Sequence, residues 1–238
     1  MCTLSFIPLC HSSESFILTS NRDEAADRKT IPPKIYKENA CTLLYPKDAV
    51  AGGTWIGASS KKRLITLMNG AEKAHVSKDS YRLSRGVVVK DFLTADDVLH
   101  RLETYVFEEI EPFTMIIVSW KVGLELYELI WNGTKVLFKK LKTQPHIWSA
   151  SMTYSQEMKE KRHQWFYDFL ERENWQDNPK KKLWDFHHSA GAEDKDLGFI
   201  IDRGKLKTTS ITQFSLENTE KTMRFDNLIT QEESLVSF

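Results

Sequence analysis

The chain has 238 residues, of which 41% are hydrophobic, and it carries 33 basic and 33 acidic side chains. A net charge near zero gives no electrostatic case for binding nucleic acid or an anionic membrane surface, and no stretch approaches the roughly 18 uncharged apolar residues of a membrane span. The hydrophobic content is enough for a substantial core, and no Gly/Ser-rich or Pro-rich linker interrupts it, so we predict a single domain over residues 1–238.

Strand-like runs and amphipathic helical windows come in blocks along the chain, which favours antiparallel sheets with segregated helices. One helix is predicted behind residues 94–97 (Thr-Ala-Asp-Asp), which have the form of a capping box, and a second is indicated by apolar side chains at helical spacing over residues 158–170. The basic run at residues 180–182, after Pro179, is predicted to be a solvated turn. Turn residues at 121–123 and 132–133 predict hairpins. The predicted strands cover residues 2–8, 15–20, 53–59, 63–68, 113–119, 124–131, 134–140, 197–202, 207–215 and 221–225.

The three cysteines, Cys2, Cys10 and Cys41, cannot all pair with one another and fit no zinc spacing. This favours a reducing compartment. The first ten residues also lack the charged region and the long apolar region of a signal peptide. We therefore expect a cytoplasmic protein without a metal site.

Cys2 directly follows the initiator Met1 and precedes an apolar run. Removal of Met1 before a small second residue is ordinary processing, and it gives Cys2 a free α-amine. The unperturbed pKa of that amine, about 8, is close to that of a thiol, so one residue can supply both nucleophile and base. The alternative is that Cys2 is a small buried hydrophobe.

The second strand-like run ends in Asn21, Arg22 and Asp23. If residues 2–8 and 15–20 form a hairpin, the chain returns to Cys2 where these three residues stand. A guanidinium near a thiol favours the thiolate, and a carboxylate near an α-amine holds and orients it. We therefore assign Arg22 to thiolate stabilisation and substrate contact, Asp23 to orienting the amine, and Asn21 to substrate binding. The alternative is a solvated ion-pair turn.

Four blocks occur in a fixed order: Met-Cys-Thr at the start, Asn-Arg-Asp-Glu at residues 21–24, Gly-Gly-Thr-Trp-Ile-Gly at 52–57 and Leu-Met-Asn at 67–69. Together they resemble the NRDE family, also called the Transport and Golgi organization family; beyond about residue 90 the resemblance rests on weaker pattern. It implies an α+β fold of the N-terminal-nucleophile hydrolase type, a four-layer αββα sandwich of two antiparallel sheets between helical layers.

The resemblance further implies hydrolysis or acyl transfer at a non-peptide carbon–nitrogen (amide) bond of a small molecule, with Cys2 as nucleophile. Similarity to bile-salt and penicillin V acylases would place an oxyanion-binding backbone N–H at Asn69, with Gly70 leaving room for substrate. Asn-Gly is also an ordinary turn dipeptide. Trp55, between Gly53 and Gly57, is expected either to floor the substrate pocket or to belong to the core.

Two departures from the family pattern weaken the enzymatic interpretation. Where related sequences carry Leu-Ser-Asn, residues 148–151 read Trp-Ser-Ala-Ser, so Ala150 replaces a donor to the oxyanion, and Ser149 or Ser151 would have to substitute. A Gly-Thr-Arg-Ser pattern is replaced by Lys-Thr-Thr-Ser at residues 207–210, which removes a second guanidinium at Thr209. Losing one oxyanion donor costs about 10²–10³ in rate, so either other groups act or hydrolysis has been lost.

The alternative function is that of a non-catalytic carrier. Members of the family have been linked to haem trafficking and lipid handling, so the resemblance also allows a protein that binds haem or acyl-CoA in the same pocket. Haem needs an axial His, Cys, Met or Tyr, and His187 and His188 are the candidate imidazoles, with Cys2 as a further possible ligand. As an enzyme the protein needs no cofactor.

Overall fold

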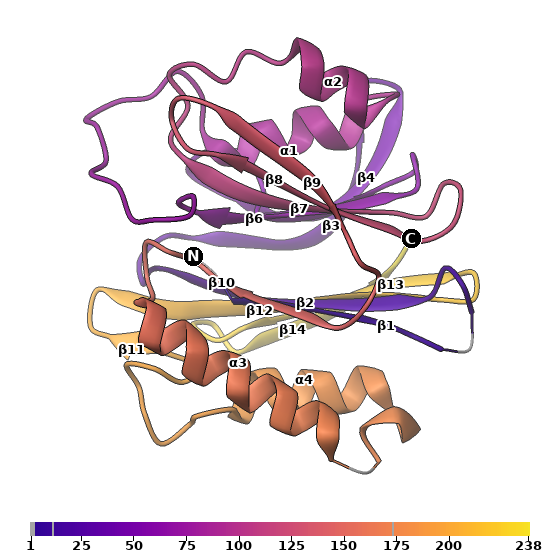
Figure 1. Ribbon diagram of the computed structural model, residues 1–238, viewed down its shortest axis with the longest axis vertical. Helices are drawn as coiled ribbons and strands as arrows, with labels where there is room; N and C mark the ends of the chain where they lie inside the picture. Colours follow the sequence, from indigo (N-terminus) through magenta and orange to yellow (C-terminus); the bar gives the residue numbers. More distant parts are fainter. Residues whose placement is uncertain (1–2, 11, 173) are drawn as a thin grey trace. The chain divides into compact units, whose positions relative to one another are not determined.

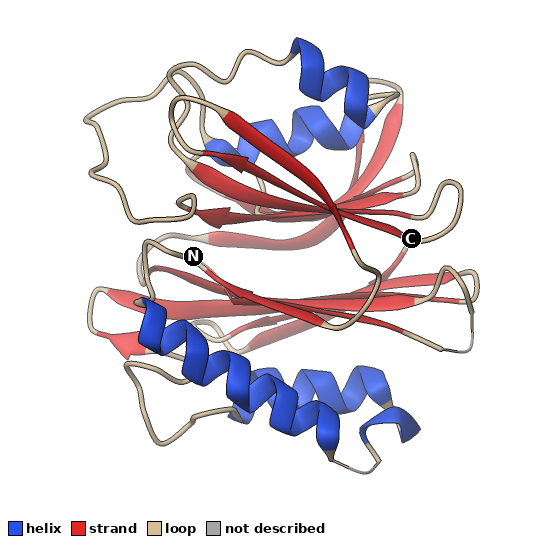
Figure 2. Cartoon of the chain, viewed as in Figure 1, coloured by secondary structure: helices blue, strands red, loops and turns tan. Residues whose placement is uncertain are grey.

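The computed structural model describes residues 3–10, 12–172 and 174–238, and contacts within it divide the chain into two compact units (Figure 1). Unit 1 is Met1–Arg28 with Gln144–Ser237, and unit 2 is Lys29–Thr143 with Phe238. Each unit is built on one antiparallel sheet and carries two α-helices (Figure 2). The predicted α+β class with two antiparallel sheets is therefore confirmed.

The sheet of unit 1 has seven strands in the order β10-β1-β2-β12-β13-β14, with β11 paired to β12 outside this path. Its centre is the hairpin of β1 and β2, in which Thr3 lies opposite Asn21, together with β12 on the far side of β2. The strands are β1 (Thr3–Pro8), β2 (Phe16–Ala25), β10 (His146–Ser149), β11 (Asp202–Arg203), β12 (Leu206–Glu217), β13 (Glu220–Asn227) and β14 (Glu232–Ser237).

Helices α3 (Gln156–Glu171) and α4 (Pro179–Ser189) cover one face of this sheet, with a 3-10 turn, η1 (Trp175–Asp177), between them (Figure 1). Alternate residues of the strands point to this face and pack against the helices, which bury one apolar cluster. Its members include Ile7, Ile17, Phe166, Leu183 and Phe199.

Side chains fix where the two helices of unit 1 begin. The Ser155 hydroxyl accepts from the Met158 N–H at 3.3 Å, and the Asn178 side chain accepts from Lys181 N–H at 3.3 Å, so both helices have N-caps. Pro179 occupies the first turn of α4, where its missing N–H costs nothing. The predicted turn at residues 180–182 is therefore wrong, because proline here begins a helix.

The sheet of unit 2 has seven strands in chain order, so each strand pairs with its sequence neighbour. Helices α1 (Arg85–Thr94) and α2 (Val98–Thr104) lie in this unit, and the buried cluster that includes Val88, Phe92 and Phe107 packs with the sheet. The strands are β3 (Thr30–Glu38), β4 (Cys41–Asp48), β5 (Ile56–Ser59), β6 (Arg63–Asn69), β7 (Phe113–Ser119), β8 (Glu125–Trp131) and β9 (Val136–Leu141).

The capping box predicted at residues 94–97 is wrong in its details. Thr94 is the last residue of α1, and the cap of α2 is Asp97, whose carboxylate accepts from the N–H groups of Leu99 and His100 at 2.7 and 3.0 Å. The predicted start of one helix is thus the junction between two short helices, α1 and α2.

Nine of the ten predicted strand ranges overlap strands of the structure, whereas in the range 197–202 only Asp202 belongs to a strand, β11. Carbonyls of this segment accept instead from side chains: Leu197 from Arg162, and Phe199 from Asn21. Strand β3 was not predicted because Pro32 and Pro33 interrupt it. Its register with β4 shifts at these prolines, as expected for an edge strand.

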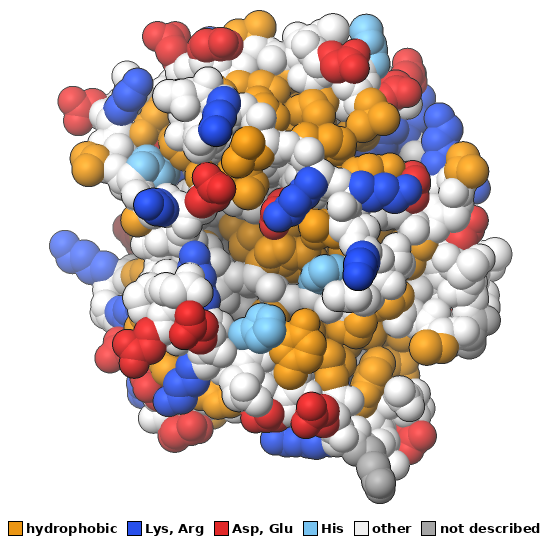
Figure 3. All heavy atoms as spheres, in the orientation of Figure 1, with side chains coloured by type: hydrophobic (Ala, Val, Ile, Leu, Met, Phe, Trp, Pro, Cys, Tyr) orange, Lys and Arg blue, Asp and Glu red, His pale blue; other side chains and the backbone are white. Residues whose placement is uncertain are grey.

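Within the described ranges, no helix combines the length and apolarity that a bilayer crossing requires. On the face shown in Figure 3, basic and acidic side chains alternate without a broad patch of one sign. This distribution agrees with the balanced composition of the sequence.

Candidate active site

Three consecutive residues of β2 carry the polar groups that the sequence singled out. Because side chains alternate along a strand, Asn21 and Asp23 point to the face that carries α3 and α4, whereas Arg22 points to the opposite face. All three are buried, with at most 1% of their surface exposed. Arg22 and Asp23 are therefore part of a buried strand and not of a solvated turn.

The Asp23 carboxylate accepts hydrogen bonds from two hydroxyls. Tyr154 donates to Oδ2 at 2.6 Å, and Thr208 donates to Oδ1 at 2.7 Å. Burial, followed by the neighbouring Asp23 charge, raises the pKa of Tyr154 well above its usual value. Tyr154 therefore remains protonated and acts as a donor to the carboxylate.

Arg22 lies beside an irregularity in the neighbouring strand. The pairing of β2 with β12 runs from Asp23 opposite Thr208 to Arg22 opposite Ser210, which leaves Thr209 as the extra residue of a β-bulge. Its hydroxyl accepts from Arg22 Nη1 at 3.3 Å and donates to the Arg22 carbonyl at 3.2 Å. The Glu24 carboxylate lies 3.6 Å from Nη2. Thr209, which stands where the family pattern has a second arginine, thus binds the guanidinium of Arg22.

Asn21 contacts the helical layer instead of an open space. Its amide donates to the carbonyls of His187 and Phe199 at 3.2 and 2.8 Å, and its Oδ1 lies 2.5 Å from His187 Nδ1. A substrate would have to displace these partners to reach the amide. The predicted substrate-binding role of Asn21 stays a prediction.

His187 is fully buried in α4, and both its ring nitrogens have partners. Nδ1 must donate to Asn21 Oδ1, so Nε2 accepts from the hydroxyl of Ser5 at 2.6 Å. Burial holds the pKa of His187 well below its usual range, so the ring is neutral. This order of contacts is that of a Ser-His-Asn relay, but Ser5 is also fully buried and reaches no solvent. As a haem ligand, His187 would have to give up one of these bonds.

His188 lies at the other side of the same helix end. Its Nδ1 is 2.8 Å from the Trp184 carbonyl, and its Nε2 is 2.9 Å from Asp226 Oδ2. Haem ligation by His188 therefore stays a prediction that requires an imidazole to leave Asp226. No cluster of three or more potential metal ligands occurs in the part of the chain that the structure describes.

Cys2 lies outside the described residues, which begin at Thr3. Thr3 is buried in β1, opposite Asn21 on one side and Ser149 on the other. Its hydroxyl accepts a hydrogen bond from the Arg162 guanidinium. The residue covalently attached to Cys2 is thus held by three elements of unit 1.

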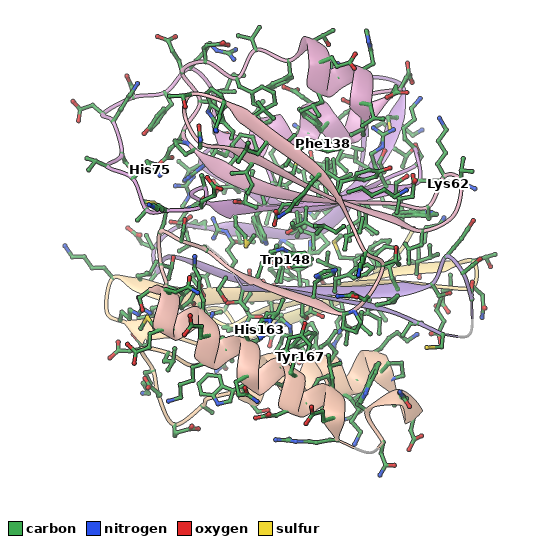
Figure 4. The ribbon with its side chains drawn as sticks, viewed as in Figure 1. Lys62, His75, Phe138, Trp148, His163 and Tyr167 are labelled. Atoms are coloured by element: carbon green, nitrogen blue, oxygen red, sulfur yellow. The ribbon has the colours of Figure 1, made fainter. Side chains whose placement is uncertain are left out.

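Ser149 and Ser151 lie at and just after the end of β10, and both are half-buried. Trp148, labelled in Figure 4, precedes them in this edge strand. Ala150 is buried between the two serines, and its carbonyl accepts from the Thr153 and Tyr154 N–H groups at 3.1 and 3.0 Å. The turn at Ala150, where the family pattern has Asn, therefore leads directly to Tyr154.

Trp55 and Asn69 belong to unit 2. Trp55 is 2% exposed, and the glycines around it serve helix packing. A Cβ on Gly53 would lie 2.4 Å from the backbone of Gly86 in α1, and a Cβ on Gly57 would lie 2.7 Å from Leu93. These glycines therefore let α1 approach the sheet closely; whether Trp55 also contacts a substrate stays a prediction.

Asn69 is the last residue of β6, opposite Phe113, and is half-buried. Gly70 follows in the left-handed region with φ 85°, donates its N–H to Pro112 at 3.1 Å and accepts from the Thr114 hydroxyl at 3.0 Å. The Asn69 side-chain oxygen is buried and has no hydrogen-bond partner among the described residues. This orphaned acceptor suits a donor from a ligand or water.

The structure brings Asn21 and His187 into contact on the helical face of the unit 1 sheet, with Asp23 on the same face and Arg22 on the other, and Ser149 lies opposite Thr3. Sequence reasoning missed four residues that contact this group: Tyr154, Arg162, Thr208 and Thr209. The only available signal was the run of three hydroxyl residues at 208–210. Nothing in the sequence pairs Tyr154 or Arg162 with the strand.

The family model described as Transport and Golgi organisation 2 matches residues 1–222 of this chain. Comparison with curated protein sequences gives no match.

Solved structures of several hydrolases are similar over almost the whole chain. Penicillin V acylase from Agrobacterium tumefaciens has a TM-score of 0.63 at 10% identity, covering 99% of this chain and 86% of that chain. A conjugated bile acid hydrolase from Clostridium perfringens has a TM-score of 0.59 at 10% identity, covering 100% and 92%. A Caenorhabditis elegans N-acylethanolamine-hydrolyzing acid amidase ortholog has a TM-score of 0.59 at 12% identity, covering 89% and 92%. At such identities the similarity shows the fold alone, which is that of the N-terminal-nucleophile hydrolases.

Proposed function

The chain belongs to the Transport and Golgi organisation 2 family, and on this premise we propose that it is an N-terminal-cysteine hydrolase or acyltransferase for a non-peptide amide bond. The fold and the names of the three structural neighbours described above, an acylase, a hydrolase and an amidase, support this class of reaction. We expect the substrate to be a small molecule and the reaction to take place in the cytoplasm.

The observation that carries the proposal is the buried pair of Arg22 and Asp23. A guanidinium and a carboxylate lie on adjacent residues of one strand, each held by a hydroxyl of β12. Buried charged groups are costly to desolvate, and apolar side chains would often stabilise the fold at least as well, so their presence here supports a functional role. Both lie on the strand that pairs with Thr3, the residue attached to Cys2.

The proposed reaction proceeds in two steps, formation of a thioester on Cys2 and its cleavage. The Cys2 thiol gives its proton to its own α-amine, and the sulfur attacks the amide carbonyl. The carbon–nitrogen bond then breaks, the α-ammonium returns the proton to the leaving amine, and a thioester remains. Water, or an acceptor nucleophile in the case of acyl transfer, attacks the thioester carbonyl and releases the Cys2 thiol.

Other residues have defined tasks in this scheme. Arg22 favours the thiolate and contacts the substrate, while Asp23 orients the α-amine. The backbone at Asn69 would stabilise the oxyanion, and Trp55, Asn21, Ser149 and Ser151 are candidates for substrate contact. A hydroxyl of Ser149 or Ser151 would replace the amide donor that Ala150 lacks.

Intact-mass analysis before and after reaction with iodoacetamide tests the nucleophile directly. We expect the purified protein to lack Met1 and the Cys2 alkylation rate to show an inflection below about pH 8, against about 8.5 for a free thiol. Cys10 is exposed and Cys41 is buried, so Cys10→Ala leaves a matched protein with one accessible thiol fewer. Alkylation of Cys2 no faster than that of Cys10 would contradict the proposal.

A panel of amides completes the test. Penicillin V, a conjugated bile acid and an N-acylethanolamine are suitable, since the structural neighbours are named for them. Cys2→Ala should abolish turnover, and Cys10→Ala should leave it unchanged. Arg22→Lys keeps the charge but loses the planar fork, so we expect it to weaken substrate binding more than folding. A large fall in melting temperature with binding intact would instead assign Arg22 to structure.

A non-catalytic carrier is the second candidate, favoured by the methyl group of Ala150 and the hydroxyl of Thr209 where donors to an oxyanion are expected. Binding tolerates the loss of transition-state donors that catalysis does not. Titration with haem and with acyl-CoA, followed by Soret absorbance and thermal shift, would then saturate at micromolar concentration without amide turnover. His187→Ala or His188→Ala would shift the Soret band only if that residue were the axial ligand. Cys2-dependent turnover without binding of either ligand would exclude the carrier.

A further inference from the structure

A continuous set of buried contacts joins Thr3 to Asp23 through two residues of the α3 region that the family blocks do not include. Arg162 of α3 donates from Nη1 to the Thr3 hydroxyl, from Nε to the Leu197 carbonyl at 2.9 Å and from Nη2 to the Gly198 carbonyl. Its guanidinium carbon lies 3.7 Å from the centre of the Tyr154 ring. The hydroxyl of that ring donates to Asp23 at 2.6 Å.

This network is fully enclosed. Arg162 is 0% exposed, Asp23 1% and Tyr154 2%. A buried cation is tolerated only where its donors find acceptors, and Arg162 combines a hydroxyl, two carbonyls and an aromatic face. The cost of enclosing these groups means that the arrangement does more than fill space, since well-packed apolar side chains would stabilise the fold at least as well.

Asp23 keeps hydrogen-bonding capacity after these contacts. A carboxylate offers about four lone-pair positions, and hydroxyls of Tyr154 and Thr208 occupy two of them. The unused positions can accept from an α-ammonium group. Cys2 is bonded to Thr3, so their Cα atoms are about 3.8 Å apart. The network therefore holds both ends of the predicted contact: the carboxylate, and the residue next to the amine.

We propose that Tyr154 and Arg162 are positioning residues that fix Asp23 and the Thr3 end of β1, so that the α-amine of Cys2 meets the Asp23 carboxylate. The assignment rests on the proposed N-terminal nucleophile. The Tyr154 hydroxyl fixes the orientation of the Asp23 carboxylate. Arg162 fixes the position of β1 through its hydrogen bond to Thr3, and it fixes the Tyr154 ring by stacking on it. Neither residue touches the substrate.

Tyr154→Phe isolates the hydroxyl, because phenylalanine retains the ring that stacks on Arg162. The chain offers a matched control in unit 2, where the Tyr105 hydroxyl donates to Asp91 at 2.7 Å. Tyr105→Phe removes a tyrosine–carboxylate bond of the same kind at a half-buried site, so it should lose somewhat less thermal stability than Tyr154→Phe. Only Tyr154→Phe should change the chemistry of Cys2.

The readout is the pH dependence of Cys2 alkylation in the full chain with Met1 removed. A held ammonium beside the thiol favours the thiolate, so its release in Tyr154→Phe should raise the inflection by about half a pH unit or more. At pH 7 the Cys2 alkylation rate then falls about threefold. Arg162→Lys, which keeps the charge but cannot serve Thr3 and both carbonyls together, should show a smaller rise. Tyr105→Phe should show none.

An unchanged inflection in Tyr154→Phe, with the low inflection present in the unmodified chain, would overturn the positioning role alone. A wild-type inflection near that of a free thiol would overturn the proposed nucleophile and, with it, this assignment. If Tyr154→Phe does not fold, Thr3→Val decides. It removes the acceptor of Arg162 at nearly constant shape, and an unchanged inflection there would equally refute the role.

Discussion

The side chains buried between sheet and helices differ in polarity between the two units. In unit 2 this layer is a large apolar cluster in which Phe92, Phe107 and Phe113 are prominent. In unit 1 a smaller apolar cluster adjoins buried polar groups, including Asp23, Arg162 and His187. Apolar packing tolerates adjustment, whereas each buried polar group requires its own partner in a set geometry. The helix-facing side of unit 2 thus relies mainly on apolar packing, whereas that of unit 1 also depends on the hydrogen-bond partners of its buried polar groups.

The largest expected effect is the loss of apolar packing in unit 2. Phe92 is fully buried and its ring centroid lies 5.2 Å from that of Tyr105. We expect Phe92→Ala to lower the free energy of unfolding by about 3–5 kcal/mol, measured by urea denaturation. Leu99→Ala, at a side chain that is 48% exposed in the same unit, is the control and should have little effect. A loss below about 1 kcal/mol in Phe92→Ala would contradict the contrast between the layers.

A second test concerns the close approach of α1 to its sheet. The methyl of Gly53→Ala would meet the Gly86 backbone at 2.4 Å, which cannot move as a side chain end could. We expect a loss of about 1–3 kcal/mol in the free energy of unfolding. Gly123→Ala isolates backbone strain, since its φ is +82° but an added Cβ meets nothing within 4 Å. Equal losses in both variants would mean that the tight contact has no energetic weight.

The polar layer of unit 1 should make stability depend on pH. Burial, then the charges of His188 and Arg162, lowers the pKa of His187 well below its usual range, so the unfolded chain binds a proton that the folded chain refuses. Stability should therefore be lost as the pH falls below about 6.5, by up to about 1.4 kcal/mol per pH unit until the folded pKa is reached. Urea denaturation across this range measures the slope.

His187→Gln removes the buried titrating group and should flatten that slope, whereas His188→Gln, at a half-buried position, should leave most of it. If both variants keep the wild-type profile, another group in the chain causes the acid sensitivity.

The smallest expected effect comes from a polar group of unit 2, where such groups serve at helix ends. Asp97→Ala removes the two N-cap hydrogen bonds of α2 and should cost about 1 kcal/mol of unfolding free energy. The side chain of its neighbour Asp96 pairs with Lys61 on the surface, so Asp96→Ala should cost less when both variants are compared by urea denaturation. The reverse order would show that the surface pair matters more than the cap.

Local patterns predicted the parts of the fold that local physics determines. The middle hairpins followed from turn residues such as Asn132 and Gly133, and α3 followed from its apolar spacing. Helix α4 was missed because its sequence begins with Pro179 and three lysines, which resemble a turn. Strand β3 was missed because two prolines interrupt its pattern.

The candidate site could be predicted only in part, for a physical reason. Arg22 and Asp23 were found because they stand together at the end of one strand. Tyr154 lies 131 positions from Asp23, and Thr208 lies 185 positions from it. No periodicity encodes contacts of such separation, since they arise only when sheets and helices assemble. Likewise the glycines around Trp55 suggested a pocket, whereas their neighbours in α1 show a packing contact.

The bulge at Thr209 has a consequence for changes in chain length. Side chains alternate across a strand, so one residue more or less exchanges the faces of everything beyond it. With the extra residue in place, Thr208 meets Asp23 on one face while Ser210 lies opposite Arg22 on the other. Deleting Thr209 would make Thr208 and Ser210 neighbours, which face opposite sides in a regular strand, so the pairing on both sides of the bulge could be kept. Within β12, Thr209 is therefore the position where the register should tolerate a deletion, with loss of the hydroxyl that contacts Arg22, whereas a deletion further along the strand would exchange the faces of the residues beyond it.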